Sequence, residues 1–461
     1  MTLFLYGAPA SGKSTLGRRL AERLGVAWID LDEQITAEAG RPIPEIFRTE
    51  GESGFRARER AALLRLLAEP AAKRVISLGG GTLLDPDNRQ RCEAAGTIAC
   101  LATPDREELS RRIGSAAGSR PLGDRAAERA AHYASFPNRI AASFDAGESL
   151  VVVGNGFSGM LLQGARPVAD ATVAALYPDR LPDPVARIPS GEEHKTPATV
   201  QRLWTAFARA GIGRRDTVTA VGGGVTGDLT GFAAATWMRG IDWINLPTTL
   251  LAMVDASTGG KTGCDLPEGK NLAGAFHSPK LVAIDTDFLT TLPAAILADG
   301  RAEMIKHEVI GGLDHTAAPT GIPSADEIAR NLAVKVGIVR EDPFEKTGRR
   351  MLLNCGHTVA HAVEKLSAYG ISHGSAVAIG CVEEARMAVR RGLADPAWPE
   401  ELAARFAAAG LPTTLPAGIT ETTMIPIMQG DKKHCGATIH FALPCGWGDV
   451  RDVAVTYESG K

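Results

Sequence analysis

The sequence predicts an α/β protein in three parts, two α/β units followed by a mostly helical one. Three observations carry this prediction. A glycine-rich phosphate-binding pattern lies between an apolar strand and a helix near residue 10, apolar runs that end in glycine turns recur between residues 150 and 290, and Ala-rich helical patterns follow Pro293. The length of 461 residues also exceeds one ordinary core and suits about three structural units.

Composition and charge exclude several classes of protein. Hydrophobic residues make up 44% of the chain and charged residues 22%, as in ordinary globular proteins. The net charge of −3 gives no basic field for nucleic acid, and no run approaches the ~20 apolar residues that span a bilayer. The seven cysteines form no C-x-x-C pair, which favours reduced thiols. With no secretion signal at the N-terminus, we expect a cytoplasmic protein without membrane or nucleic-acid partners.

The first unit opens with a phosphate-binding loop. Residues 7–14 follow the pattern G-x-x-x-x-G-K-S after a buried strand at residues 2–6, and the helix that follows has an apolar face at Leu16, Leu20 and Leu24. The glycines let backbone N–H groups surround a phosphate, Lys13 adds a positive charge, and Ser14 offers a hydroxyl to Mg²⁺. A Gly/Ser turn that matches the pattern by chance is the alternative. We therefore expect a nucleotide at this loop.

Carboxylates and arginines in the same unit suit phosphoryl transfer. Asp30 and Asp32 occupy alternate positions after an apolar pair, so on a strand both would point to one side. One can hold Mg²⁺ while the other accepts a hydroxyl proton. Arg56 and Arg120 supply guanidinium groups, although a single arginine usually marks a solvated helix face. Further strands are expected at residues 75–78 and 97–101, and helices between 105 and 140.

The second unit is expected to begin with a strand at residues 150–153, and we place the domain boundary just before it. A strand at 218–221 leads into three glycines and a helix, a turn that brings backbone N–H groups against a pyrophosphate. Its spacing differs from G-x-G-x-x-G, so a tight turn without a ligand is the alternative. Further strands are expected at 243–246 and 281–284. No flexible linker separates the first two units.

The helical part holds candidate metal ligands. Glu303, His357 and His373 lie in or beside glycine-containing motifs, and two histidines with one carboxylate suit a catalytic Zn²⁺ with one position left open. His357 and His361 are four residues apart and share a helix face, so this pair is a rival assignment. For each histidine alone, a hydrogen-bonded residue without a metal is the alternative. A short β-like segment is expected at 438–443.

The first unit resembles shikimate kinase in the ordered set G-x-x-x-x-G-K-S-T, D-x-D, F-R-x-x-E, G-G-G, R-P-L and R-x-x-x-Y. The resemblance implies a P-loop kinase fold, Mg²⁺ at Ser14 and Asp30, and catalytic roles for Asp32 at the attacking hydroxyl and for Arg120 on a lid that is shorter than the family's. The residues implied for ATP are Gly7, Ala10 (where the family usually has glycine), Ser11, Gly12, Lys13, Ser14, Thr15 and Arg120. Those implied for shikimate are Asp32, Arg56, Gly80 and Arg129.

The remainder resembles 3-dehydroquinate synthase in the strings G-G-G-V-x-G-D, P-T-T-L-L-A-x-V-D-A-S-x-G-G-K-T-G, K-N-L-x-G-A-F, G-R-A-E-x-I-K, L-N-x-G-H-T-x-x-H-A and D-K-K, in that order. The resemblance implies Zn²⁺ or Co²⁺ at Glu303, His357 and His373. The residues implied for NAD⁺ are Glu192, Lys195, Gly223, Gly224, Asp228, Thr248, Thr249, Asp255, Lys261, Lys270, Phe288 and Thr291. Those implied for substrate are Arg239 (from a neighbouring subunit), Asn271, Arg350, His361 and Lys433. Those implied for catalysis are Lys261, Lys306, Arg350 and His361.

Together the two resemblances imply a bifunctional enzyme of the shikimate pathway. One reaction phosphorylates shikimate with ATP and Mg²⁺, and the other converts 3-deoxy-D-arabino-heptulosonate 7-phosphate to 3-dehydroquinate and phosphate. We expect a P-loop kinase domain at 1–147, a Rossmann-like NAD-binding α/β domain at 148–291, an all-α metal- and substrate-binding domain at 292–461, and a homodimer through the synthase part. The alternative is a metal-dependent polyol dehydrogenase joined to a nucleotide-binding module that does not catalyse.

Overall fold

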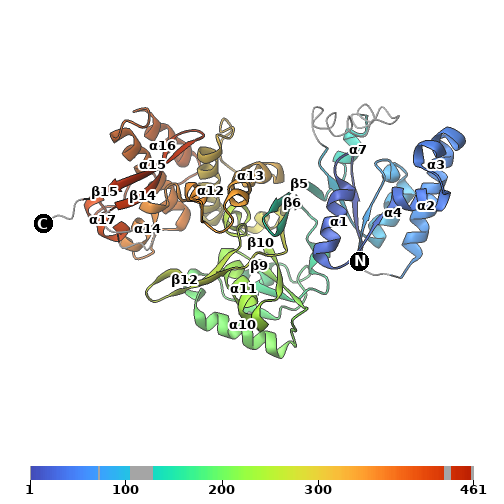
Figure 1. Cartoon of the computed structure of the whole chain (residues 1–461), viewed down its shortest axis with the longest axis horizontal. Coiled ribbons are helices and arrows are strands. Elements are labelled where there is room, and N and C mark those ends of the chain that lie inside the picture. Colours follow the sequence, from blue (N-terminus) through green and yellow to red (C-terminus); the bar gives the residue numbers. More distant parts are fainter. Residues whose placement is uncertain (1, 71–72, 104–127, 430–437, 458–461) are drawn as a thin grey trace.

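The computed structural model describes residues 2–70, 73–103, 128–429 and 438–457 (Figure 1). Within these residues, strands far apart in the chain join one mixed sheet with the order β2-β3-β1-β4-β5-β6-β13-β10-β9-β7-β8. Its strands are β1 (Thr2–Tyr6), β2 (Ala27–Asp30), β3 (Arg74–Ser77), β4 (Gly96–Leu101), β5 (Arg139–Ala146), β6 (Ser149–Asn155), β7 (Pro167–Asp170), β8 (Ala186–Ile188), β9 (Thr217–Gly222), β10 (Asp242–Pro247) and β13 (Leu281–Asp285). The predicted α/β class is confirmed.

The N-terminal part is built around β1, which is buried throughout and pairs in parallel with β3 and β4. The chain leaves β1 through Gly7 (φ 134°) and enters α1 at Gly12 (φ 95°), two conformations that glycine adopts without strain. The predicted strand, loop and helix are thereby confirmed. The helices of this part are α1 (Lys13–Leu24), α2 (Leu31–Ala39), α3 (Ile43–Ala68), α4 (Pro86–Ala95) and α7 (Ala130–Ala134), with the 3₁₀ turn η1 (Thr82–Leu84).

The two aspartates expected on one strand are placed differently. Asp30 ends β2, whereas Asp32 lies in the first turn of α2. Oδ1 of Asp30 accepts hydrogen bonds from the backbone N–H groups of Asp32 (2.9 Å) and Glu33 (3.4 Å), so Asp30 is the N-cap of the helix. The strand prediction for Asp32 is wrong because this cap turns the chain into a helix directly after Asp30.

The first two parts meet in a β-hairpin. β5 pairs in parallel with β4 only at Cys100 and Leu101, whereas β6 runs antiparallel to β5 along nearly its whole length and pairs in parallel with β13. In Figure 1 the hairpin lies between α1 and α13 (Ala325–Glu341), and both helices contribute to one hydrophobic core through residues such as Leu20 and Leu332. The boundary expected between 147 and 148 therefore falls in a hairpin turn inside a continuous sheet. Residues 139–140, expected to be helical, begin β5 instead.

Beyond the hairpin, β13, β10, β9, β7 and β8 are parallel. The strands predicted at 218–221, 243–246 and 281–284 are confirmed as β9, β10 and β13, whereas β7 and β8 were not predicted. β9 ends at Gly222 and α11 begins at Gly224, which confirms the predicted strand, glycine turn and helix. The antiparallel hairpin of β11 (Lys261–Leu266) and β12 (Gly269–Phe276) was not predicted. The helices here are α8 (Gly159–Leu162), α9 (Ala171–Leu176), α10 (Pro197–Arg209) and α11 (Gly224–Thr236), with the short helical turns η2 (Glu192–His194), η3 (Trp237–Arg239), η4 (Ala252–Ala256) and η5 (Thr286–Thr291).

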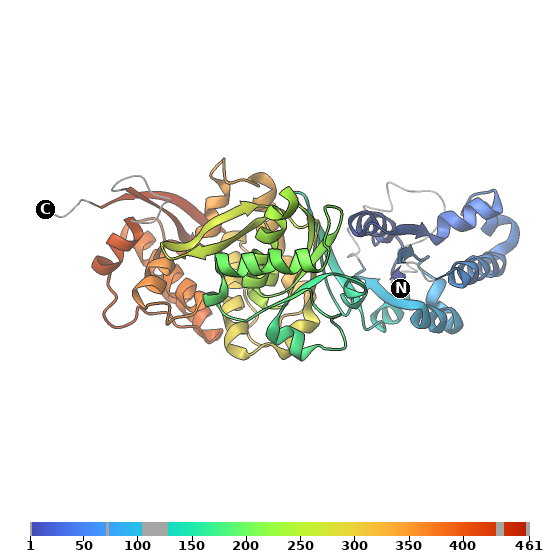
Figure 2. The same cartoon turned by 90° about the horizontal axis from the view of Figure 1, so that it is seen from below.

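The part after Pro293 is mostly helical, as predicted, and its residues from 357 onward, drawn in orange and red, lie at the opposite end of the molecule from α1–α4 (Figure 2). The predicted segment at 438–443 is the first strand of a closing hairpin, β14 (Thr438–Gly446) with β15 (Asp449–Thr456). Among the described residues, no helix combines the length and apolar character needed to cross a membrane. Besides α13, the helices are α12 (Ala294–Gly311), α14 (His357–Leu366), α15 (His373–Arg390), α16 (Trp398–Ala408) and α17 (Glu421–Gln429), with the turn η6 (Arg349–Asn354).

Candidate active sites

The N-terminal site is built on the loop between β1 and α1. Lys13 is buried, and its Nζ donates to the carbonyl oxygens of Gly7 (3.0 Å) and Ala8 (2.7 Å), so the side chain folds back over the loop. Burial lowers the pKa of Lys13 to about 8, although nearby carboxylates, first that of Asp32, oppose the shift. Ala10 has a φ of 60°, so it keeps the left-handed conformation that a glycine at this position would adopt.

The residues predicted for Mg²⁺ meet beside this loop. Oγ of Ser14 donates a hydrogen bond to Oδ2 of Asp30. A hydroxyl and a carboxylate are the oxygen ligands that Mg²⁺ prefers. Gly12, the N-cap of α1, offers no side-chain acceptor, so the first-turn N–H groups of the helix remain available to an anion.

Three of the residues predicted to bind shikimate lie around the glycine run at residues 79–81. A Cβ on the third glycine would overlap Nη2 of Arg56, and one on the first would lie 3.2 Å from Oδ1 of Asp32. Nη1 of Arg129 donates to the carbonyl of Gly80 (3.3 Å). Two guanidinium groups and a carboxylate thus surround one glycine turn, while Arg120 lies outside the described residues.

Glu59 supports this arrangement, although the sequence analysis did not single it out. Its side chain is 2% exposed and accepts hydrogen bonds from Nη1 of Arg56 (2.6 Å) and Oγ1 of Thr82 (2.7 Å). These bonds fix the orientation of the Arg56 guanidinium. The signal was present in the F-R-x-x-E string, since residues three apart share a helix face.

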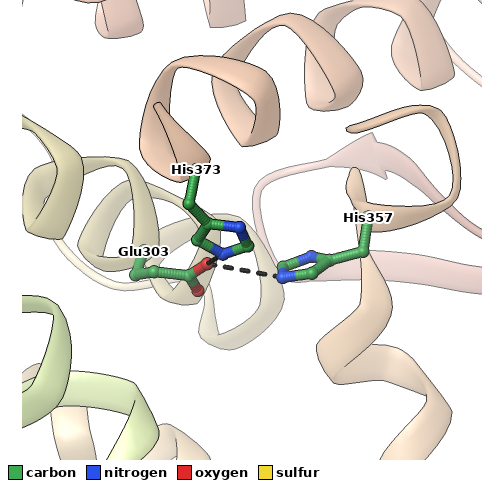
Figure 3. Close-up of side chains that lie close together, drawn as sticks. All are labelled: Glu303, His357 and His373. Carbon is green, nitrogen blue, oxygen red and sulfur yellow. Dashed lines mark hydrogen bonds and ion pairs between the residues drawn. The ribbon is translucent and has the colours of Figure 1, made fainter. Parts of the chain in front are cut away.

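The second site centres on Glu303, His357 and His373, which come from α12 and from the first residues of α14 and α15 (Figure 3). Nε2 of His357 (3.4 Å) and Nε2 of His373 (3.3 Å) approach the same oxygen, Oε1 of the buried Glu303. The ring of His361 lies 5.6 Å from that of His357, and His361 belongs to no cluster of three potential ligands among the described residues. The structure therefore favours the predicted set over the rival pair.

Hydrogen-bonding groups outside the proposed ligand set fix the orientation of the His357 and His373 rings. Nδ1 of His357 lies 3.1 Å from the carbonyl oxygen of Cys355, which can only accept, so Nδ1 carries the hydrogen and Nε2 presents a lone pair. Burial lowers the pKa of His357 to about 4. Burial also lowers the pKa of His373, but hydrogen bonds to Glu303 and Glu364 outweigh it and raise that pKa to about 10. Two oriented imidazoles and a carboxylate fit Zn²⁺ or Co²⁺, with the proton on His373 as the one that a cation would replace.

Two buried lysines adjoin this cluster. Lys306 forms an ion pair with Glu303 and lies 3.9 Å from Oδ1 of Asp255, which is also 2.7 Å from Nζ of Lys335. Burial tends to raise the pKa of Asp255, but Lys335 and Lys306 hold it well below its usual range. Lys335 was not predicted, because it lies 80 residues from Asp255 in the chain and belongs to no local motif.

Several of the residues predicted for NAD⁺ lie near the start of α11. Nζ of the buried Lys195 lies 2.7 Å from Oδ2 of Asp228 and 2.7 Å from Oδ1 of Asn271. Gly223 is the N-cap of α11, and a Cβ on it would lie 3.1 Å from Cγ2 of Thr249. The glycine turn, the lysine and the carboxylate therefore lie near one another at the start of this helix, and buried Thr248 adjoins the same turn.

A chain of ion pairs joins this region to the metal candidates. Nζ of Lys270 lies 3.8 Å from Glu192 and 3.4 Å from Glu364. The Glu364 carboxylate is in turn 3.5 Å from Nδ1 of His373. Glu364 was not predicted either, although it is the carboxylate that links the two sets of predicted residues.

The cations predicted for substrate lie near Glu345. Lys261 forms an ion pair with Glu345, and Nε of Arg350 is 3.8 Å from the same carboxylate oxygen. Nη1 and Nη2 of Arg350 donate to the carbonyls of Pro343 (2.8 Å) and Gly259 (3.1 Å). An acidic partner thus holds two substrate-binding candidates side by side.

Three residues predicted to bind NAD⁺ or substrate lie away from the contacts described so far. The ring of Phe288 packs edge-on against Tyr177 at 5.0 Å, and Oγ1 of Thr291 is 2.7 Å from the Tyr177 hydroxyl. Arg239 is exposed and has a φ of 70°. Its role requires a second subunit and stays a prediction, and Lys433 lies outside the described residues.

Comparison with known protein families gives the same division of the chain into a first unit and a longer second part. The family model for shikimate kinase matches residues 9–144, and those for the N-terminal and C-terminal parts of 3-dehydroquinate synthase match 185–299 and 300–434. The 3-dehydroquinate synthase of Synechococcus sp. is 44% identical over 322 residues, which cover 67% of this chain and 86% of the relative. That of Lactiplantibacillus plantarum is 44% identical over 283 residues, covering 60% and 77%.

One solved structure, 2-epi-5-epi-valiolone synthase from Streptomyces hygroscopicus with NAD⁺ and Zn²⁺ bound, is similar with a TM-score of 0.61 and 27% identity, covering 69% of this chain and 95% of that one. These similarities favour a dehydroquinate synthase over the alternative of a polyol dehydrogenase for the part after the first unit. The chain belongs to the 3-dehydroquinate synthase family and carries a shikimate kinase domain before it, which makes it a bifunctional enzyme of the shikimate pathway.

Proposed function

We propose that the N-terminal site transfers the γ-phosphoryl group of ATP to shikimate. We also propose that the second site converts 3-deoxy-D-arabino-heptulosonate 7-phosphate to 3-dehydroquinate and phosphate. The observation that carries the synthase assignment is the convergence of Glu303, His357 and His373, which is linked through Glu364 and Lys270 to the residues proposed for NAD⁺.

In the kinase, the loop N–H groups and Lys13 bind the nucleotide phosphates. Ser14 and Asp30 hold Mg²⁺, which neutralises phosphate charge. Asp32, at the glycine turn, orients the shikimate hydroxyl and accepts its proton. Arg56, already fixed by a buried carboxylate, pairs with the shikimate carboxylate.

In the synthase, bound NAD⁺ supplies a hydride acceptor, and a divalent ion at Glu303, His357 and His373 supplies a Lewis acid. Lys261 and Arg350 bind the anionic groups of the substrate. Buried Lys306 and half-buried Asp255 lie next to Glu303 and keep an ammonium group and a carboxylate charged beside the proposed metal ligands.

Assays of both half-reactions on the purified chain test this proposal. His357→Ala should remove the bound metal and abolish phosphate release from the heptulosonate, while shikimate-dependent ADP formation continues. His440→Ala, on an exposed strand position, is the matched control and should leave both reactions intact. Unchanged metal content in His357→Ala would refute the ligand set.

We also propose a homodimer, in which exposed Arg239 completes the site of the neighbouring subunit. Arg239→Ala and His357→Ala should each inactivate the synthase. Mixing the two variants should restore part of the activity, because one site in the mixed dimer then carries neither substitution. A monomer in sedimentation experiments, or no recovery after mixing, would contradict this arrangement.

A further inference from the structure

The helix that begins with His357 lacks a cap from its own chain segment. α14 starts after Gly356, whose φ is 77° and which has no side chain to accept the free N–H groups of the first turn. A side chain does not fit there, since a Cβ on Gly356 would overlap Sγ of Cys381. A Cβ on Gly380 of α15 would likewise overlap the carbonyl oxygen of Gly356. Serine, threonine or aspartate, the usual N-caps, are therefore sterically excluded.

A residue of the neighbouring helix α15 supplies the missing acceptor. Oε2 of Glu384 accepts a hydrogen bond from the backbone N–H of Gly356 (2.7 Å), and Oε1 accepts one from that of Val359 (3.3 Å). Glu384 is 0% exposed. The two bonded amides lie on either side of His357 in the chain.

Packing alone does not explain an acid at this position. The core to which α14 and α15 both contribute is made of apolar side chains such as Val363, Val377 and Ile379, and a buried carboxyl group costs free energy unless its hydrogen bonds are made. A leucine or methionine would fill the same volume without that cost. The carboxyl group is compensated by the amides of α14, so its effect falls on the first turn of that helix.

We propose that Glu384 is a positioning residue for the metal site, a cap from one helix that fixes the first turn of another and with it the imidazole of His357. His357 presents Nε2 to Glu303 because its backbone and the carbonyl of Cys355 are both held. A ligand must be held to about 0.5 Å for full effect. This inference rests on the proposed metal site and adds a residue that touches neither the metal nor the substrate.

Three variants test the proposal on the metal-free full-length protein. Glu384→Met keeps a similar volume and removes both acceptors, whereas Glu384→Gln keeps one. Glu383→Met, which changes the adjacent, half-buried residue on α15 that pairs with Arg386, is the matched control. Competition with a chromogenic chelator gives the affinity for Zn²⁺ and Co²⁺, and amide hydrogen exchange reports the capped N–H groups directly.

We expect Glu384→Met to weaken metal binding by about tenfold to a hundredfold, the range found when an outer partner of a metal ligand is lost. We expect Glu384→Gln to fall in between and Glu383→Met to match the wild type. The amides of Gly356 and Val359 should exchange faster in Glu384→Met, whereas those of the β14–β15 hairpin should not. Faster exchange throughout the helical part would instead indicate general loosening and would contradict a local capping role.

His357→Ala separates this inference from the metal site itself. If His357→Ala loses the metal while Glu384→Met and Glu384→Gln both keep wild-type affinity, the positioning role is wrong and the metal site stands. If His357→Ala keeps the metal, the metal site proposed here is wrong, whatever Glu384 does.

Discussion

Glu364 and His373 form an ion pair of 3.5 Å on the side of the imidazole ring opposite Glu303, so His373 lies between two carboxylates. The same Glu364 oxygen is 3.4 Å from Nζ of Lys270. One buried carboxylate thus contacts both a proposed metal ligand and a proposed NAD⁺ residue. Burial tends to raise the pKa of Glu364, but His373 and Lys270 outweigh it and hold that pKa at about 2, so the group is charged at neutral pH.

This shared carboxylate predicts that the metal and NAD⁺ sites weaken together when it is neutralised. In Glu364→Gln, His373 loses a partner that fixes its ring, and metal affinity should fall by about tenfold or more. NAD⁺ affinity should fall as well, because Lys270 loses its buried anchor. Chelator competition and calorimetric NAD⁺ titration measure the two effects. Lys365→Gln, one residue away and exposed, should change neither, and a metal affinity equal to that of the wild type in Glu364→Gln would contradict the linkage.

The pKa of Lys13 predicts how nucleotide binding depends on pH. Burial places this pKa at about 8 in the free protein, so the ammonium group loses its proton as the pH rises through that value. A polyphosphate favours the charged form, so binding above pH 8 takes up a proton and the affinity falls by up to about tenfold per pH unit. Calorimetry in buffers of different ionisation enthalpy measures the uptake. Equal heats in all buffers at about pH 9 would refute the shifted pKa.

A substitution that inactivates one active site should leave the other active. Lys13→Ala removes the charge that holds the nucleotide phosphates, and shikimate-dependent ADP formation should fall by more than about a hundredfold. Phosphate release from the heptulosonate should stay at the wild-type rate, and His357→Ala should show the reverse pattern. Loss of both activities in Lys13→Ala would show that the sites depend on each other.

Lys335 should contribute to the stability of the protein through its ion pair with Asp255. Lys335→Met leaves Asp255 without its closest cation, and the free energy of unfolding should fall by about 3 kcal/mol, as when a buried pair loses one partner. The double variant Lys335→Met/Asp255→Asn removes the stranded charge and should recover much of this loss. Urea unfolding of the metal-free proteins measures both values, and equal stability of the two variants would exclude an unpaired charge as the cause.

The β5–β6 hairpin predicts where the chain can be divided. A fragment of residues 148–461 lacks β5, which exposes the edge of β6 and uncovers apolar residues of α13. A fragment of residues 138–461 keeps the hairpin. We expect the longer fragment to have the higher melting temperature and soluble yield. A higher melting temperature and soluble yield for the shorter fragment would instead support a domain boundary just before residue 148.

Local patterns predicted the features that depend on neighbouring residues. The phosphate loop, the strand that enters it and the glycine turn before α11 all appear in short stretches of sequence. The sequence does carry a signal for the helical position of Asp32, since Asp30 followed by Glu33 is the spacing of a helix N-cap and its third helical residue. The residue types and their motifs named Glu303, His357 and His373 as candidate metal ligands but left His361 as a rival, and the family resemblance chose between them.

The remaining features arise from contacts between distant segments. Lys335 meets Asp255 across 80 residues, and Glu384 accepts a hydrogen bond from Gly356, which lies 28 residues earlier at the start of α14. Neither belongs to a motif, because a long-range ion pair or cap needs only one residue of the right type at each end. The continuity of the sheet also depends on distant segments. Only the pairing of β5 with β6 shows that β5 is not the last strand of a separate sheet.

The turn between β5 and β6 also decides what an insertion there would do. Gly147, with a φ of 65°, closes this turn, and the strands on both sides of it are fixed by main-chain hydrogen bonds. Extra residues at this point lengthen a surface loop without moving the kinase away from the synthase. A reporter peptide placed at residue 147 would therefore be carried as a side loop, and the relative orientation of the two catalytic centres would stay as it is.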